Sequence, residues 1–160
     1  EMFEKVLKEI NQFDNVVELG CGVGILGSKI TAELSCVYTG YDISAQAVAY
    51  AKARFLDASE LNVRDIDTTH LDEASIVVAT ELMEHLDEEV FDRVVSTIDA
   101  SDARKFVFTV PDNCMGPDEV PEHTALFNEE LVRERMKPYT NWTLRVEKAD
   151  DHHLICVMER

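Results

Sequence analysis

A glycine-rich stretch, Glu18 to Gly24, lies between a strand pattern and a helix pattern. Residues 15–19 form a short apolar run typical of a buried strand, and residues 25–34 have helical spacing. Glycine lets the backbone turn tightly and lets a ligand approach the chain directly. The helix that follows offers free N–H groups at its N-terminus. The stretch therefore predicts a strand, a ligand-binding loop and a helix in succession.

The rest of the chain repeats this alternation of strand and helix patterns. Further helices are expected over residues 2–10, 44–55, 87–98 and 128–136, and further strands over 36–41, 61–66, 75–80, 105–110, 142–148 and 153–158. Such alternation predicts an α/β fold with a mostly parallel sheet and helices on both faces. The connection between the last two strands is too short for a crossover helix, so the last strand must run antiparallel to its neighbour.

The size and composition of the chain favour one globular domain over residues 1–160. At 160 residues and 18.1 kDa there is room for one core, and no linker or repeat divides the chain. No apolar run approaches the roughly 20 residues that span a membrane, and no signal peptide opens the chain. The four cysteines are widely spaced, which fits a reducing cytoplasm. A net charge of −17 disfavours binding to nucleic acid.

The glycine loop alone is compatible with two kinds of cofactor. Residues 22–27 satisfy the G-x-G-x-x-G pattern of dinucleotide-binding proteins, and Asp42 lies where a ribose-binding acid is expected. However, Glu18 and Gly20 precede that pattern. A carboxylate fits poorly beside a pyrophosphate but well near the cationic amino-acid end of a sulfonium cofactor. The chain also lacks the second domain that dehydrogenases usually carry, so the sulfonium cofactor is favoured over a nicotinamide.

Two segments resemble the motifs of class I S-adenosylmethionine-dependent methyltransferases. The sequence VVELGCGVGILG is similar to the first motif of that family, and YDIS, residues 41–44, to the second. The resemblance covers essentially the whole chain. It implies a Rossmann-like seven-stranded sheet whose last strand is antiparallel, which agrees with the alternation described above.

The resemblance also implies which residues hold S-adenosylmethionine. The loop glycines would line its methionine and ribose, Asp42 would accept the ribose hydroxyls, and Ile43 would pack on the adenine. Asp65, or Asp67, would accept the adenine amino group. The implied cofactor residues are Glu18, Gly20, Cys21, Gly22, Gly24, Asp42, Ile43, Asp65, Ile66 and Glu81. The alternative role for Asp42 is to cap the helix that follows.

The segment Glu81-Leu82-Met83-Glu84-His85 follows the predicted strand 75–80 directly. Ligands of open α/β sheets bind beyond the carboxyl ends of the strands, so this segment borders the reaction site. In a helical turn, Glu81, Glu84 and His85 would come within reach of one point. Two carboxylates and an imidazole suit Mg²⁺ or Mn²⁺. His123, in the loop after the fifth strand, is a fourth candidate ligand.

This E-x-x-E-H segment resembles two branches of the family. Ubiquinone-biosynthesis O-methyltransferases and related small-molecule enzymes often carry it, and so do small-RNA 3′-end 2′-O-methyltransferases. In the second branch a later histidine completes a metal site that holds the terminal ribose hydroxyls. The chain departs from that branch in its acidity and in lacking a second histidine near His123. It also has no clear basic or aromatic RNA-binding set between Pro111 and Phe127.

Three roles remain open for His85. It could act with Glu84 as a catalytic pair, deprotonating the acceptor, because an unperturbed imidazole titrates near neutrality. It could bind a metal with Glu81 and Glu84. It could also make only a structural hydrogen bond. His70, His152 and His153 carry no motif and are expected to be surface or strand residues.

The expected function is methyl transfer from S-adenosylmethionine to a hydroxyl or amine of a small-molecule acceptor. Acidic side chains in the loop after residue 111 suit a cationic or neutral acceptor, unless they are merely solvated. Two alternatives are a metal-dependent RNA 2′-O-methyltransferase and a cofactor-binding subunit without activity.

Overall fold

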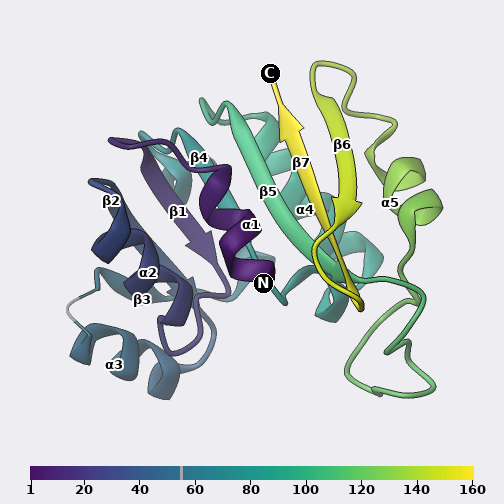
Figure 1. Cartoon of the computed structure of the whole chain (residues 1–160), viewed down its shortest axis with the longest axis horizontal. Helices are drawn as coiled ribbons and strands as arrows, with labels where there is room; N and C mark the ends of the chain where they lie inside the picture. The colour runs from purple at the N-terminus through teal and green to yellow at the C-terminus, as the bar shows by residue number, and fades with distance from the viewer. Residues whose placement is uncertain (55) are drawn as a thin grey trace.

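The computed structural model describes residues 1–54 and 56–160, and it contains a seven-stranded sheet with helices on both faces (Figure 1). The strands are β1 (Asn15–Leu19), β2 (Val37–Asp42), β3 (Ala58–Glu60), β4 (Ile76–Ala79), β5 (Lys105–Pro111), β6 (Thr143–Lys148) and β7 (His153–Glu159). The α-helices are α1 (Met2–Lys8), α2 (Ile25–Glu33), α3 (Ala45–Ala53), α4 (Glu88–Asp99) and α5 (Glu129–Met136). Short 3₁₀ turns are η1 (Val63–Asp65), η2 (Thr68–Leu71) and η3 (Met83–His85).

The strand order across the sheet is β3-β2-β1-β4-β5-β7-β6. Strands β3, β2, β1, β4 and β5 pair in parallel, whereas β7 is antiparallel to both β5 and β6. In Figure 1 the arrow of β7 accordingly points opposite to that of β1. The predicted α/β fold, with its antiparallel last strand and helices on both faces, is confirmed.

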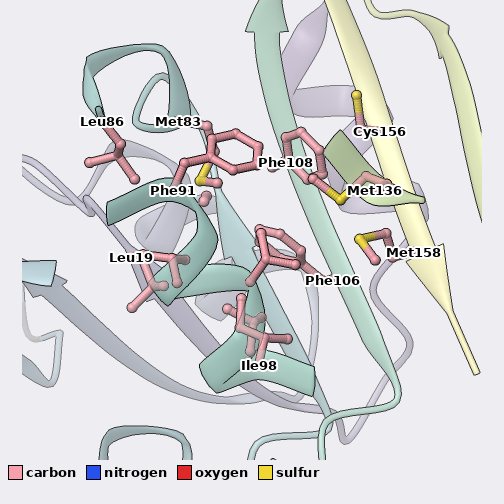
Figure 2. Close-up of a cluster of buried hydrophobic side chains, with 14 of the residues drawn as sticks. Leu19, Met83, Leu86, Phe91, Ile98, Phe106, Phe108, Met136, Cys156 and Met158 are labelled. Atoms are coloured by element: carbon pink, nitrogen blue, oxygen red, sulfur yellow. The ribbon is translucent and has the colours of Figure 1, made fainter. Parts of the chain in front are cut away.

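The central strands β1, β4 and β5 are mostly apolar because both of their faces are covered. In β4, Val77 and Ala79 belong to the core beneath α4 and α5, and Ile76 and Val78 to the core beneath α1, α2 and α3. The side chains of Figure 2, from α4, β5, α5 and β7 among others, converge in the first of these cores. Strand β4 can therefore carry polar side chains only beyond its end, where Glu81 follows.

An aromatic group joins this core to the loop that follows β5. Phe91 of α4 contacts Phe108 of β5 edge to face, with ring centroids 6.4 Å apart (Figure 2). The ring of Phe127 also stacks with Phe91, with centroids 6.1 Å apart, and Phe127 is fully buried. The end of the loop over residues 112–127 is thus anchored in the core, which holds His123 near the sheet.

The third strand differs from the prediction. A strand over residues 61–66 is wrong: β3 is Ala58–Glu60, and η1 and η2 follow it. The reason is local capping, because the Asn62 side chain accepts a hydrogen bond from the N–H of Arg64, and Asp67 accepts one from Thr69. Leu61 and Ile66, on either side of η1, are both buried. Their burial gave the sequence an alternation of apolar and polar residues that resembles a strand.

The remaining elements lie close to their predicted positions. The helix expected to begin after Ser44 does so, and Phe55, placed at its predicted end, lies outside the described residues. The four cysteines are free thiols. Among the described helices, none has the length and apolar character to cross a membrane.

Candidate active site

The glycine loop between β1 and α2 adopts a backbone conformation that is unfavourable for residues with a side chain. Gly20 and Gly24 have φ angles of 74° and 81°, in the left-handed region. A Cβ atom on Gly24 would lie 2.4 Å from Cδ1 of Leu56. The N–H groups of Gly20 and Cys21 both donate to the carbonyl oxygen of Tyr41, at 2.7 and 2.9 Å. The loop is therefore fixed against the end of β2.

Asp42, the last residue of β2, fastens the same loop through its side chain. One carboxylate oxygen accepts from the N–H of Gly22 at 2.8 Å, and the other from the N–H of Ser44 at 2.9 Å. The cap of α3 is Ser44, whose hydroxyl oxygen accepts from the N–H of Ala47. Asp42 is thus not the helix cap, and it lines the cavity described next.

A cavity of about 260 Å³ opens beside Asp42, at the carboxyl ends of the strands. Ile43 lines it with a side chain that is 68 % exposed. Asn62 lines it where the prediction had Asp65, which lies in η1 outside the lining. The lining residues are Gly20, Asp42, Ile43, Leu61, Asn62, Val63, Arg64, Leu82, His85, Leu86 and Val90.

Several predicted cofactor residues lie behind the cavity wall. Cys21 and Ile66 are buried in the two cores. Glu18 is buried beneath the loop, where its carboxylate accepts a hydrogen bond from the hydroxyl of Tyr38 at 2.5 Å. Burial raises the pKa of Glu18 to about 8, although the bond from Tyr38 opposes this shift. The structure therefore gives Glu18 a place in the support of the loop.

On the other side of the cavity, three candidate metal ligands come together. One ligand atom each from Glu84, His85 and His123 lies within 4.8 Å of the others. Glu84 and His85 belong to η3, the next element after β4, and His123 comes from the loop after β5. Thr124 joins the two segments, because its N–H donates to the carbonyl oxygen of Glu84 and its hydroxyl to that of Leu86.

Both histidines are oriented through one ring nitrogen. Nδ1 of His85 lies 3.3 Å from the carbonyl oxygen of Glu122, and Nδ1 of His123 is hydrogen-bonded to the carbonyl oxygen of Met115. An Nδ1–H that donates to a carbonyl leaves Nε2 with a free lone pair, the usual state of a metal-bound histidine. The two rings meet edge to face, with centroids 4.7 Å apart.

Glu84 has the environment of a metal ligand. Its side chain is buried, and neither carboxylate oxygen has a hydrogen-bond partner among the described residues. Burial, together with the charge of Glu81, raises the pKa of Glu84 to about 7. Buried polar atoms are rarely left unpaired, and a divalent cation would satisfy both oxygens. The carboxylate suits a hard cation such as Mn²⁺, and the two imidazoles also suit softer divalent cations such as Fe²⁺ or Zn²⁺.

Glu81, the fourth predicted ligand, lies outside this group of three. It follows β4 with a φ of 54°, and its N–H donates to the hydroxyl of Thr109 at 3.2 Å. One of its carboxylate oxygens lies 3.4 Å from Nε2 of His153, the first residue of β7. No sequence motif marked His153, because only the antiparallel pairing of β7 brings it to this edge.

The observed fold agrees with the comparison to protein families. Residues 17–101, more than half of the chain, match the model described as a methyltransferase domain. The chain belongs to this family. It is a methyltransferase, and Gly20 of its glycine loop and Asp42 both line the cavity. No curated protein matches the sequence.

Solved structures share the fold of this methyltransferase at low sequence identity. The small RNA methyltransferase HEN1 is 16 % identical with a TM-score of 0.80, and the match covers 99 % of this chain and 24 % of that one. The methyltransferase domain of bacterial-CtHen1 is 19 % identical with a TM-score of 0.77, covering 98 % and 95 %. Magnesium protoporphyrin IX methyltransferase from Synechocystis PCC 6803, with bound SAH, is 14 % identical with a TM-score of 0.77, covering 99 % and 81 %.

These proteins are named for acceptors as different as small RNA and a magnesium porphyrin. The chain spans about a quarter of the length of the HEN1 chain. A shared fold does not select an acceptor. For this methyltransferase the acceptor must be inferred from its own side chains.

Proposed function

We propose that this methyltransferase is a divalent-metal-dependent O-methyltransferase, and that its acceptor is a small molecule bearing a hydroxyl group. The observation that carries the proposal is the position of His85. This residue lines the cavity beside Asp42 and also belongs to the cluster with Glu84 and His123. The methyl donor and the cation would therefore meet at one side chain.

The donor side of the site would bind S-adenosylmethionine through residues 20–24, Asp42 and Ile43. The loop glycines allow the cofactor to approach the backbone, and the Asp42 carboxylate can accept from the ribose hydroxyls. Ile43 offers its exposed side chain to the adenine. Asn62, which lines the cavity, has a side chain that can both donate to and accept from the adenine edge.

The acceptor side would bind Mn²⁺ or Mg²⁺ through Glu84, His85 and His123. Such a cation would bind the acceptor oxygen and lower the pKa of its hydroxyl. This chemistry favours a hydroxyl over an amine, because hard cations prefer oxygen ligands. Methyl transfer then requires the oxygen to attack the methyl carbon in line with the breaking carbon–sulfur bond. The role of these residues is to hold that alignment.

A small neutral or cationic acceptor suits the electrostatics of the chain. The net charge is −17, and the loop that carries His123 also carries Asp118, Glu119 and Glu122. Such a surface repels the phosphates of a nucleic acid. We further propose that residues 1–160 act as one domain, because a single sheet carries both sides of the site.

A second candidate acceptor is the 3′-terminal ribose of an RNA. Two structures with the same fold are a small RNA methyltransferase and a bacterial-CtHen1 methyltransferase domain. The segment containing Glu81, Glu84 and His85 resembles the metal-binding segment of that branch. The two hydroxyls of a terminal ribose would bind a cation as well as a small diol does. The acidic surface is the observation against this candidate.

The test combines metal removal with two acceptor classes. Methyl transfer from labelled S-adenosylmethionine is measured with a panel of small phenols and diols and with a short RNA that ends in a 3′ diol. Each is assayed after EDTA treatment and after Mn²⁺ is restored. We expect turnover on a small acceptor that EDTA abolishes and Mn²⁺ restores. Turnover only on RNA favours the second candidate, and activity that is insensitive to EDTA refutes metal dependence.

A matched pair of variants distinguishes the cluster from general loss of charge. Glu84→Gln removes a buried carboxylate from the cluster, whereas Glu122→Gln removes an exposed one from the same loop region. Mn²⁺ binding to each apoprotein is measured by calorimetry. We expect binding to be lost only in Glu84→Gln.

A further inference from the structure

Three side chains that the methyl-transfer scheme does not use form a row at the start of β7. Nδ1 of His153 lies 2.8 Å from an oxygen of Asp150, and Nε2 lies 3.4 Å from an oxygen of Glu81. The His153 side chain is largely buried, with 17 % exposed. An imidazole between two carboxylates can donate a hydrogen bond to both in its protonated form. The row leads from the β6–β7 turn to the edge of the active site.

The fold explains why His153 reaches that edge. Because β7 runs antiparallel to β5, its first residue pairs with Pro111, the last residue of β5. The parallel strand β4 ends at the same edge, where Glu81 follows it. A residue at the start of an antiparallel strand therefore faces the reaction site of its parallel neighbours.

The turn before β7 is built to fix the imidazole. The same oxygen of Asp150 accepts from the backbone N–H groups of His152 and His153, both at 2.9 Å. The N–H of Ala149 donates to the carbonyl oxygen of His153 at 2.8 Å. Because Asp150 is held by the backbone, it can hold the His153 ring in one orientation.

Glu81 is fixed both through its backbone and through its side chain. Its backbone adopts a left-handed φ of 54°, which is unfavourable for a residue with a side chain, and Thr109 accepts its N–H. One oxygen of its carboxylate lies 3.4 Å from Nε2 of His153. It lies close enough to Glu84 to raise the pKa of that carboxyl group. A strained backbone and a directed side chain indicate that the position of this carboxylate matters to the site.

We propose that His153, held by Asp150, is a positioning residue that orients Glu81 as the fourth protein ligand of the cation bound by Glu84, His85 and His123. The inference rests on the proposed metal-dependent function. Carboxylate ligands are commonly hydrogen-bonded by a second residue that fixes their orientation. Without His153, Glu81 would have to lose side-chain freedom whenever the cation binds.

The experiment measures Mn²⁺ binding to the apoprotein by calorimetry in His153→Ala, with His152→Ala as the matched control. His152 is the exposed neighbour of His153. Among the described residues it bonds Asp150 through its backbone N–H and not through its side chain. We expect His153→Ala to weaken Mn²⁺ binding by roughly 10–100-fold and His152→Ala to leave it unchanged. His153→Gln, whose amide can still donate to Glu81, should recover most of the affinity.

A double-mutant cycle ties the effect to Glu81. If His153 acts through Glu81, adding His153→Ala to Glu81→Gln should weaken Mn²⁺ binding no further. S-adenosylmethionine affinity and the melting temperature are measured alongside, and we expect the cofactor affinity to stay unchanged in His153→Ala and His152→Ala. Additive losses, or no recovery in His153→Gln, would overturn the positioning role.

The outcomes separate this inference from the proposed function. If the unmodified protein binds Mn²⁺ and His153→Ala binds it equally well, the positioning role is wrong and the metal-dependent function stands. A lower melting temperature with unchanged Mn²⁺ affinity leads to the same conclusion, because it assigns His153 to fold stability alone. If the unmodified protein binds no Mn²⁺, the proposed function fails, and the inference fails with it.

Discussion

Two buried glutamates, one on each side of the cavity, make a natural comparison. Glu18 lies beneath the glycine loop and Glu84 beneath the acceptor side, and burial raises the pKa of both carboxyl groups, to about 8 and about 7. Glu18 has a partner, the hydroxyl of Tyr38, whereas the oxygens of Glu84 have none among the described residues. A buried acid with a hydrogen-bond partner can stabilise the fold. A buried acid without a partner needs a bound ligand to offset the free-energy cost of its desolvation.

The two sides of the cavity also differ in how they are assembled. The cofactor side is a compact unit in which Asp42 binds the loop at Gly22, twenty residues earlier in the chain. The acceptor side gathers His85, His123 and His153 from three separate elements. The Asp42 side chain and the Tyr41 carbonyl oxygen fix the loop on the first side, whereas Thr124 joins two segments that are distant in the chain on the second.

The largest expected effect comes from Glu84→Gln. Turnover should fall by at least roughly 100-fold, because a catalytic cation contributes several kcal/mol to methyl transfer. The apoprotein should become more stable at alkaline pH, because the variant removes an unpaired buried charge. Activity assays and urea unfolding would measure the two effects. Activity and stability falling together would break the comparison, because Glu84 would then serve the fold as Glu18 does.

A stability change with pH is the second prediction, and it concerns Glu18. In the unfolded chain its pKa returns to the ordinary 4.5, whereas in the folded chain it is about 8. Between these values the folded state keeps a proton that the unfolded state has lost, so the free energy of unfolding falls as pH rises. Glu18→Gln should remove this contribution, which is on the order of a few kcal/mol over the window.

The measurement is urea unfolding of the unmodified protein and Glu18→Gln at several pH values across that window. The difference between the two proteins isolates Glu18, because both contain the other titrating groups. Glu33→Gln, at the exposed end of α2, is the control and should give no such difference. A pH-independent difference would mean that Glu18 is charged in the folded protein.

The third prediction concerns Asp42→Ala. The variant should weaken S-adenosylmethionine binding by roughly 10–100-fold, because hydrogen bonds to a charged group contribute about 1.5–3 kcal/mol. It also frees the N–H of Gly22, so part of the loss reflects a less ordered loop. Calorimetry gives the cofactor affinity, and Mn²⁺ affinity in the same samples should not change. Equal loss of both ligands would indicate that the two sides of the cavity are one cooperative unit.

The difference between the two sides explains what the sequence could predict. The glycine loop and Asp42 were predictable because short-range motifs encode their contacts. His123 was predictable as a neighbour of His85 because loops after adjacent parallel strands meet at one edge. His153 was not, because its place depends on the register of β7 against Pro111 rather than on a motif. Asp65 was predicted and Asn62 was not, because Leu61 and Ile66, which are buried on either side of a capped turn, gave the pattern of a strand.

The smallest expected effect concerns Asn62, which takes the place of Asp65 at the cavity. Asn62 lines the cavity and Asp65 does not, so Asn62→Ala should weaken S-adenosylmethionine binding by roughly 2–10-fold, the effect of one neutral hydrogen bond. Asp65→Ala, at the exposed end of the same 3₁₀ turn, should leave the affinity unchanged. Because the Asn62 side chain also caps η1, the melting temperature must be followed to separate lost contact from local unfolding. Asn62→Asp, which keeps the cap but carries no amide donor, makes this separation direct. If Asp65→Ala weakened binding more than either Asn62 variant, the adenine contact would have to come from the position that the motif first suggested, and η1 would have to rearrange when the cofactor binds.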